Sequence, residues 1–131
     1  MNVEIWSDVM CPFCYIGKRK FENALAQFPH KENINIIWKS FQLDPTTVTD
    51  PSLNTIDNLA EKKGWSKQQA QETTAHVTNV AKQVGLDFHF EKAVVANSFD
   101  AHRLSHLAKK YGKQNDLEEK LFQAYFTDGK N

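Results

Sequence analysis

The sequence is poor in cysteine and proline, and it carries no excess charge of either sign. Only two cysteines and four prolines occur among 131 residues, and 16 basic side chains balance 16 acidic ones. This balance gives no electrostatic reason to expect nucleic acid or an anionic membrane as a partner. No apolar run approaches the ~18 residues that a membrane span requires, and no secretory signal follows Met1. We therefore expect a cytoplasmic protein, and no motif indicates a cofactor.

The two cysteines, Cys11 and Cys14, are separated by only two residues. A structural disulfide would be expected to close a longer loop in an oxidising compartment, so this spacing leaves redox chemistry, metal binding or chance. Residues 3–8 are rich in β-formers and predict a strand. Pro12 favours the first position of a helix, where its missing N–H has no partner in any case. A cysteine pair between a strand and a helix favours the redox interpretation.

The hydrophobic pattern predicts an α/β fold. A helix over residues 12–27 joins the first strand to a second strand over residues 34–43, and a crossover of this length suits parallel strands. Residues 1–45 would form this β-α-β unit, and residues 46–131 a helical subdomain. Its predicted helices cover residues 55–63, 67–84, 98–111 and 117–128, with capping boxes at Ser66 with Gln69 and at Asp116 with Glu119.

The helix N-terminus assigns different roles to the two cysteines. Its free N–H groups and partial positive charge should lower the pKa of Cys11 below ~8.5, which makes Cys11 the nucleophile. Cys14 should be more buried and resolve the mixed disulfide. Pro12 and Phe13 would tune the reduction potential, and the apolar Phe13 predicts a milder oxidant than a cationic residue would give. One apolar face of the helix is predicted to hold Phe13, Cys14, Gly17, Phe21, Ala24, Leu25 and Phe28.

A zinc site is the main alternative for the cysteine pair. Zinc needs about four ligands, and His102 and His106, four residues apart on a predicted helix, could supply two. The helical wheel places both histidines opposite the apolar stripe, facing solvent, so we predict no metal. The stripe comprises Ala101, Leu104, Leu107, Ala108 and Tyr111.

Three segments together carry a family resemblance: SDVMCPFC at residues 7–14, WKSFQLDP at 38–45 and NSFDAHRL at 97–104. The sequence resembles the DsbA-like family of the thioredoxin superfamily, and within it the FrnE-type cytoplasmic oxidoreductases. The resemblance implies a thioredoxin-like fold with a helical insertion. It also implies disulfide exchange with proteins or low-molecular-weight thiols. By the same resemblance, Asn97 and Arg103 would bind substrate.

One feature departs from that family, whose members continue into two more strands, a cis-proline loop and a final helix. The last proline here is Pro51, so we expect those parts to be absent and the sheet to be incomplete. A two-stranded sheet is marginal alone, and its free edge would favour a partner or self-association. Two further functions stay open. One is a glutathione-dependent transferase or isomerase of the related kappa-type branch, which has serine in place of the first cysteine. The other is a non-catalytic truncated fragment.

Overall fold

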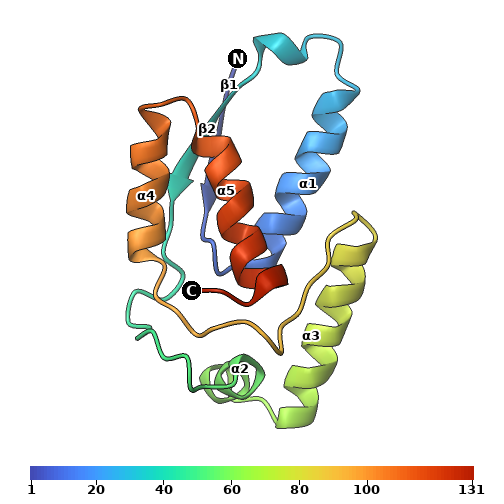
Figure 1. Cartoon of the computed structure of the whole chain (residues 1–131). Coiled ribbons are helices and arrows are strands. Elements are labelled where there is room, and N and C mark those ends of the chain that lie inside the picture. Colours follow the sequence, from blue (N-terminus) through green and yellow to red (C-terminus); the bar gives the residue numbers. More distant parts are fainter.

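The computed structural model describes all 131 residues as a small parallel sheet surrounded by five α-helices (Figure 1). The elements are β1 (Asn2–Ser7), α1 (Pro12–Ala26), a 3-10 turn η1 (Lys31–Asn33), β2 (Asn35–Ser40), α2 (Thr55–Lys63), α3 (Lys67–Lys82), α4 (Phe99–Lys109), α5 (Gln114–Gln123) and a π-helical turn η2 (Ala124–Asp128). The predicted α/β class is confirmed. No helix combines the length and the apolar character needed to cross a membrane.

The β-α-β unit forms as the sequence predicts. Strands β1 and β2 are parallel, in a register that runs from Asn2 opposite Asn35 to Ser7 opposite Ser40, and α1 connects them. Strand β2 is shorter than predicted because the chain leaves the sheet after Ser40. The N–H of Leu43 instead donates to the Asp8 carboxylate at 2.8 Å, which draws the connector toward the turn after β1.

The two edges of the sheet differ. At the outer edge of β2, the N–H of Trp38 donates to Gln114 Oε1 at 3.4 Å, and Gln114 Nε2 donates to the Trp38 carbonyl at 3.3 Å. Helix α5 therefore occupies hydrogen-bonding groups that a third strand would otherwise use. Strand β1 pairs only with β2, so its other edge has no neighbouring strand. An edge of this kind is free to accept a further strand.

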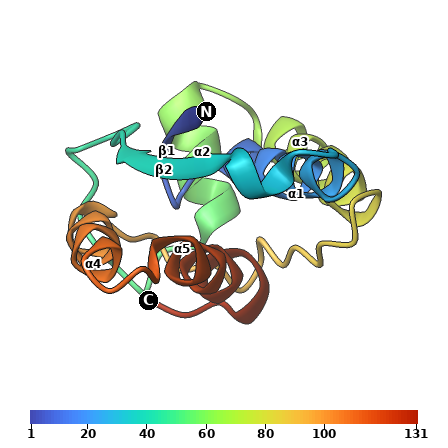
Figure 2. The ribbon, with the colours of Figure 1, turned by 90° about the horizontal axis from the view of Figure 1, so that it is seen from above.

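A single aromatic core joins residues 1–45 to residues 46–131. The ring of Tyr15 in α1 stacks on Phe122 of α5 at 5.0 Å and on Phe88 at 5.9 Å between centroids. Trp38 of β2 meets Phe122 edge-on at 6.4 Å. Viewed from above, α4 and α5 lie on the same side of the sheet (Figure 2). Because Phe122 is fully buried between the two parts, both parts contribute to one core.

The predicted inner face of α1 is mostly wrong, although Cys14 does pack against the core. The helix buries Tyr15, Ile16 and Lys18, whereas Phe13 and Phe28 are exposed. The reason is that the aromatic core contacts the Tyr15 side of the helix. Much of the predicted face lies instead along an open, wholly apolar hollow of about 310 Å³. That hollow is lined by Met1, Val3, Phe21, Ala24, Leu25, Phe28 and Ile34.

Of the two capping boxes that the sequence predicts, one is present and the other is not. The capping box at Ser66 and Gln69 is confirmed, with both reciprocal hydrogen bonds present. The capping box at Asp116 is wrong, because α5 begins three residues earlier and Lys113 is its N-cap. The early start brings Gln114 into the helix, where its side chain reaches β2. Residues 86–90, between α3 and α4, form no strand.

Candidate active site

The cysteines occupy the turn between β1 and α1, as predicted. Strand β1 ends at Ser7, and the N–H of Cys11 donates to the Asp8 carbonyl at 3.0 Å, which closes the turn. Cys11 is the N-cap of α1 in an extended conformation, and Pro12 takes the first helical position. Cys14 follows within the first helical turn, with its N–H donating to the Cys11 carbonyl at 3.1 Å.

The two thiols are free, hydrogen-bonded to each other and half-buried to a similar degree. The expected difference in burial between Cys11 and Cys14 is therefore not present. Their surroundings differ in kind: Cys14 packs against the aromatic core, whereas Cys11 does not belong to that cluster. An incoming disulfide can thus approach Cys11 without displacing core side chains.

The hydrogen bond between the sulfurs shifts the pKa values of the two cysteines in opposite directions. The Cys14 sulfur accepts a hydrogen bond from the Cys11 thiol, which lowers the pKa of Cys14 to about 6 although Cys14 is half-buried. The Ser7 hydroxyl and the Asp8 N–H lower this pKa further. The same hydrogen bond, together with burial, raises the pKa of Cys11. This differs from the expectation that Cys11 holds the thiolate. The reason is that Cys14 receives side-chain donors that the sequence did not identify.

Ser7 is one of these donors. Its hydroxyl is buried and has no nitrogen or oxygen partner, and its proximity to the Cys14 sulfur lowers the pKa of Cys14. A buried hydroxyl without a partner costs free energy, so its orientation toward sulfur provides the compensation. Ser7 therefore favours the ionised form of Cys14.

The carboxylate of Asp8 lies buried below the cysteine turn. Burial on its own would raise the pKa of Asp8, but hydrogen bonds from His102, the Leu43 N–H and the Ser98 side chain outweigh burial and hold that pKa below its ordinary value. His102 Nε2 lies 3.1 Å from Asp8 Oδ1. Asp8 therefore stays a carboxylate close to Cys14, whose pKa its charge raises.

The orientation of α4 differs from the prediction. His102 and Ser105 are buried, whereas Leu104, Leu107 and Tyr111 of the supposed inner stripe are exposed. The polar residues of α4 face inward because they bond to buried carboxylates: His102 pairs with Asp8, and Ser105 pairs with Glu118. A signal for this existed in the small residues that flank His102 at helical spacing. They are Ser98, Ala101, Ser105 and Ala108.

Asp8, His102 and Ser105 form a buried polar layer, to which a second buried carboxylate, Glu118 of α5, also belongs. It accepts a hydrogen bond from the Ser105 hydroxyl, which also receives one from Gln114 Nε2 at 3.2 Å. Burial raises the pKa of Glu118, while the charges of His102 and Lys18 favour its ionised form. This polar layer connects the site to the edge of β2.

A hollow of about 240 Å³ opens beside Cys11. Met10 and Pro12, the two neighbours of Cys11 in the chain, contribute to its wall. Leu59 of α2 lines it from the helical region, and Lys62 lies there with its Nζ 2.8 Å from Asp44. The inserted helices therefore shape the space next to the first cysteine.

The side chain of Asn97 has four hydrogen bonds within the chain. Its Nδ2 donates to the carbonyls of Pro45 at 3.2 Å and Thr47 at 2.8 Å, and its Oδ1 accepts from the Phe99 N–H and from Gln42, both at 2.9 Å. The side chain fastens the connector after β2 to the beginning of α4. Its predicted contact with substrate stays a prediction.

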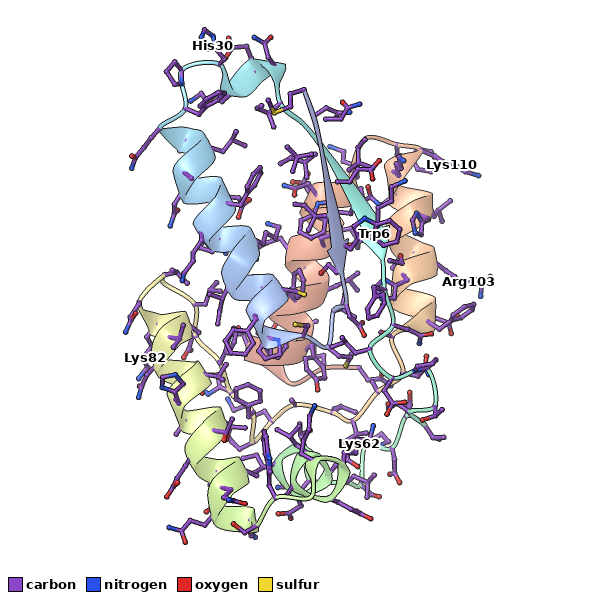
Figure 3. The ribbon with its side chains drawn as sticks, turned by 180° about the vertical axis from the view of Figure 1, so that it is seen from behind. Trp6, His30, Lys62, Lys82, Arg103 and Lys110 are labelled. Carbon is purple, nitrogen blue, oxygen red and sulfur yellow. The ribbon has the colours of Figure 1, made fainter.

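The remaining predicted residues lie at different distances from the chemistry. Phe13 lies between the cysteines in the sequence and is 58 % exposed, and its apolar side chain contributes no charge to the pair. Arg103 lies on the outer side of α4, as Figure 3 shows, and pairs only with Asp100 at 3.1 Å. The structure does not bring Arg103 to the thiols, and its role toward substrate stays a prediction.

A strand, a tight turn and a hydrogen-bonded dithiol at a helix N-terminus define a thioredoxin-like dithiol protein. Comparison with known families agrees: residues 2–131 match the DSBA-like thioredoxin domain, and the chain belongs to this family. The fold is also similar to a solved structure, that of a probable DsbA oxidoreductase from Streptomyces coelicolor. That match has a TM-score of 0.89 and 37% identity over the whole of this chain.

The chain is also similar to a curated protein, the uncharacterized protein YwbO of Bacillus subtilis strain 168, with 25% identity over 132 residues. The chain spans 59% of the length of that relative and 56% of the Streptomyces coelicolor protein. Both similar proteins are therefore considerably longer than these 131 residues.

Proposed function

We propose that this chain performs thiol–disulfide exchange, with Cys11 as the attacking sulfur and Cys14 as the resolving one. The observation that carries the proposal is the hydrogen-bonded thiol pair at the N-terminus of α1, with a first ionisation near pH 6. At neutral pH such a pair is largely monoanionic. The thiolate is the reactive form in disulfide exchange. The FrnE-type resemblance, which residues 7–14, 38–45 and 97–104 carry together, supports a cytoplasmic location.

The reaction proceeds in two balanced steps. The proton shared by the sulfurs moves to Cys14, and the Cys11 thiolate attacks a substrate disulfide, forming a mixed disulfide and releasing one substrate thiolate. Cys14 then loses its proton and attacks Cys11, so that the intramolecular disulfide forms and the second substrate thiolate leaves. Two electrons pass from the dithiol to the substrate, and the reverse sequence oxidises a substrate dithiol. Disulfide-containing proteins and low-molecular-weight thiols are the proposed substrates.

We also propose that the sheet acquires further strands, either from additional chain or from self-association. In this proposal residues 1–45 carry the reactive unit, and residues 46–131 are helices inserted before those strands. The surface supports it: 8148 Å² is exposed, about 1,100 Å² more than the roughly 7,000 Å² expected for a compact 15.0 kDa monomer. That excess exceeds the ~800 Å² that each partner buries in a standard interface.

Mixed-disulfide trapping tests the roles of the cysteines. Cys14→Ser should accumulate a covalent adduct with a model disulfide, because nothing resolves the bond at Cys11. Cys11→Ser should form little adduct under the same conditions. Mass spectrometry of the intact proteins would measure both. Equal trapping by the two variants, or trapping by Cys11→Ser alone, contradicts the assignment.

Activity measurements distinguish disulfide exchange from the two alternative functions. A glutathione-dependent transferase would retain activity in Cys11→Ser, whereas disulfide exchange would be abolished. Reduction of insulin by this chain, beside a longer chain that includes the additional length of its relatives, tests the non-catalytic alternative. Activity of the longer chain alone would favour the idea that these residues are an inactive part of an enzyme.

A further inference from the structure

Asn97 fastens the connector between β2 and α2. Residues 41–54 of this connector contain no helix and no strand, and ordering such a segment costs conformational entropy that contacts with the rest of the chain must offset. The side chain of Asn97 bonds to three connector residues, and its backbone N–H donates to the hydroxyl of a fourth at 3.0 Å. The four residues are Gln42, Pro45, Thr47 and Thr49.

The Asn97 side chain has no hydrogen-bonding capacity left for a substrate. An amide side chain offers two N–H donors and an oxygen with two lone pairs. The carbonyls of Pro45 and Thr47 accept from the two donors. The oxygen accepts from Gln42 and from the Phe99 N–H. An effect of Asn97 on the substrate must therefore pass through the residues that it holds.

The segments that Asn97 joins line the hollow of about 240 Å³ beside Cys11. One part of the wall comes from the connector, and another comes from the chain neighbours of Asn97. These lining residues are Leu43, Asp44 and Thr47 from the connector, with Ala96 and Ser98 beside Asn97. The cysteine turn itself supplies Met10 and Pro12. Without the Asn97 contacts, the connector wall is free to move relative to Cys11.

The hollow suits an apolar group without charge. Its two charged lining residues, Lys62 and Asp44, bond to each other at 2.8 Å, so neither charge is left for a ligand. Apolar side chains such as Leu59, Phe90 and Val95 form much of the remaining wall. Because an apolar cavity of ~150 Å³ accommodates benzene, the hollow has room for one aromatic side chain.

We propose that Asn97 is a positioning residue: it holds the connector so that the hollow beside Cys11 accepts an apolar group attached next to the substrate disulfide. This role rests on the proposed function and names a substrate class for it, disulfides with an aromatic or aliphatic group next to the reacting sulfur. Seating that group holds the disulfide close to Cys11, which lowers KM. Asn97 itself touches no reacting atom.

Two disulfides that differ by a single side chain test this role. They are the disulfide-linked dimers of the acetylated and amidated dipeptides phenylalanyl-cysteine and glycyl-cysteine. Single-turnover reduction of each dimer by the reduced full chain, followed by mass spectrometry, gives the half-saturating concentration (KM) and the limiting rate (kcat). The unchanged chain should have a KM roughly tenfold lower for the phenylalanine dimer, with similar limiting rates for both dimers.

Asn97→Ala removes the side-chain contacts with the connector and should abolish this preference, so that both dimers have a similar KM. The limiting rates should not change, because Cys11 and Cys14 are untouched. Asn97→Asp keeps the acceptor oxygens but loses both donors, so it should behave like Asn97→Ala. Thr49→Val removes only the acceptor of the Asn97 N–H, lies outside the lining of the hollow and should weaken the preference in part.

Asn79→Ala, at an exposed position on α3, is the matched control and should keep the full preference. A general loss of stability would slow both dimers alike and leave their KM ratio unchanged. Equal KM values in the unchanged chain overturn the proposal, and so does a full preference in Asn97→Ala. Thermal melts verify folding, and if the Asn97 variants do not fold, a full preference in Thr49→Val overturns it.

Failure of this role for Asn97 is distinguishable from failure of the proposed function. If the reduced chain reacts with neither dimer, the proposed function is contradicted. If both dimers are reduced but the phenylalanine side chain gives no advantage, or gives one that does not depend on Asn97, only the role of Asn97 is contradicted.

Discussion

Gln114 forms two hydrogen bonds with the backbone of Trp38, one accepted by its Oε1 and one donated by its Nε2. Its side-chain amide thus acts as a short substitute for a neighbouring strand at the edge of β2. The same nitrogen donates to Ser105, which ties β2, α4 and α5 together. The buried position of Gln114 is explained by these contacts.

Replacement of Gln114 should therefore destabilise the fold. Gln114→Ala leaves the N–H and carbonyl of Trp38 without these partners in a buried region, which should lower the free energy of unfolding by about 2 kcal/mol. Urea denaturation of the reduced chain would measure the change. Gln123→Ala, at an exposed position on the same helix, is the control and should change stability by less than about 0.5 kcal/mol. Equal effects of the two substitutions would contradict the role of Gln114.

The reduced chain should become more stable as the pH rises from about 6 to 9. The lowered pKa of Cys14 in the folded chain is about 6, against an ordinary value of 9.0, so its stabilisation is lost as the pH falls through 6. Above 9 the trend should reverse, because the raised pKa of Cys11 opposes its ionisation in the fold. Thermal melts across this range would measure both effects. The double variant Cys11→Ser/Cys14→Ser should lose both, and an identical pH dependence in it would refute the prediction.

Phe13 offers a way to alter the redox potential without disturbing the core. Phe13→His places an ionisable group beside the pair at an exposed position, where a cation contributes up to about 1 kcal/mol. The cation stabilises the thiolate of the reduced form, so the reduction potential should rise by up to about 20 mV. Equilibration with glutathione buffers near pH 6, where the imidazole and the thiolate can both be charged, would measure it. Phe13→Leu is the control, and a rise of the same size in that variant would show that charge is not the cause.

The apolar hollow along α1 predicts weak self-association. Leu25 and Phe28 contribute to a surface lined wholly by apolar side chains, close to the beginning of β1. Leu25→Lys should reduce association at high protein concentration, as measured by sedimentation velocity. Lys20→Glu, an exposed change elsewhere on α1, is the control. An unaltered association constant in Leu25→Lys would mean that another surface is responsible.

Local sequence signals predicted the reactive turn well. Pro12 marked the first residue of α1, and the pairing of Ser66 with Gln69 marked the beginning of α3. Both signals act within a few residues of the chain, where hydrogen-bonding requirements are decided locally. The parallel pairing of β1 and β2 also followed from the length of the crossover between them.

The other features of the fold and site could not be predicted, because they depend on contacts between residues that are far apart in the sequence. The burial of His102 depends on Asp8, 94 residues away in the chain, and no helical periodicity contains that information. Helix α1 has apolar residues on more than one side, so its pattern could not show that Tyr15, rather than Phe21, meets the core. The donors to Cys14 were missed for the same reason, because Ser7 acquires its role only once the strand and helix are assembled.

The stacking of Tyr15 on Phe122 sets a lower limit on how far the molecule can be simplified. Tyr15 directly follows Cys14, and the ring against which it rests is contributed by α5, more than a hundred positions later. A peptide made of residues 1–45 would contain both sulfurs and the helix that presents them, yet nothing would hold that helix at its angle to the strands. Engineers who want a minimal redox module from this fold must therefore keep α5, however remote it looks from the thiols.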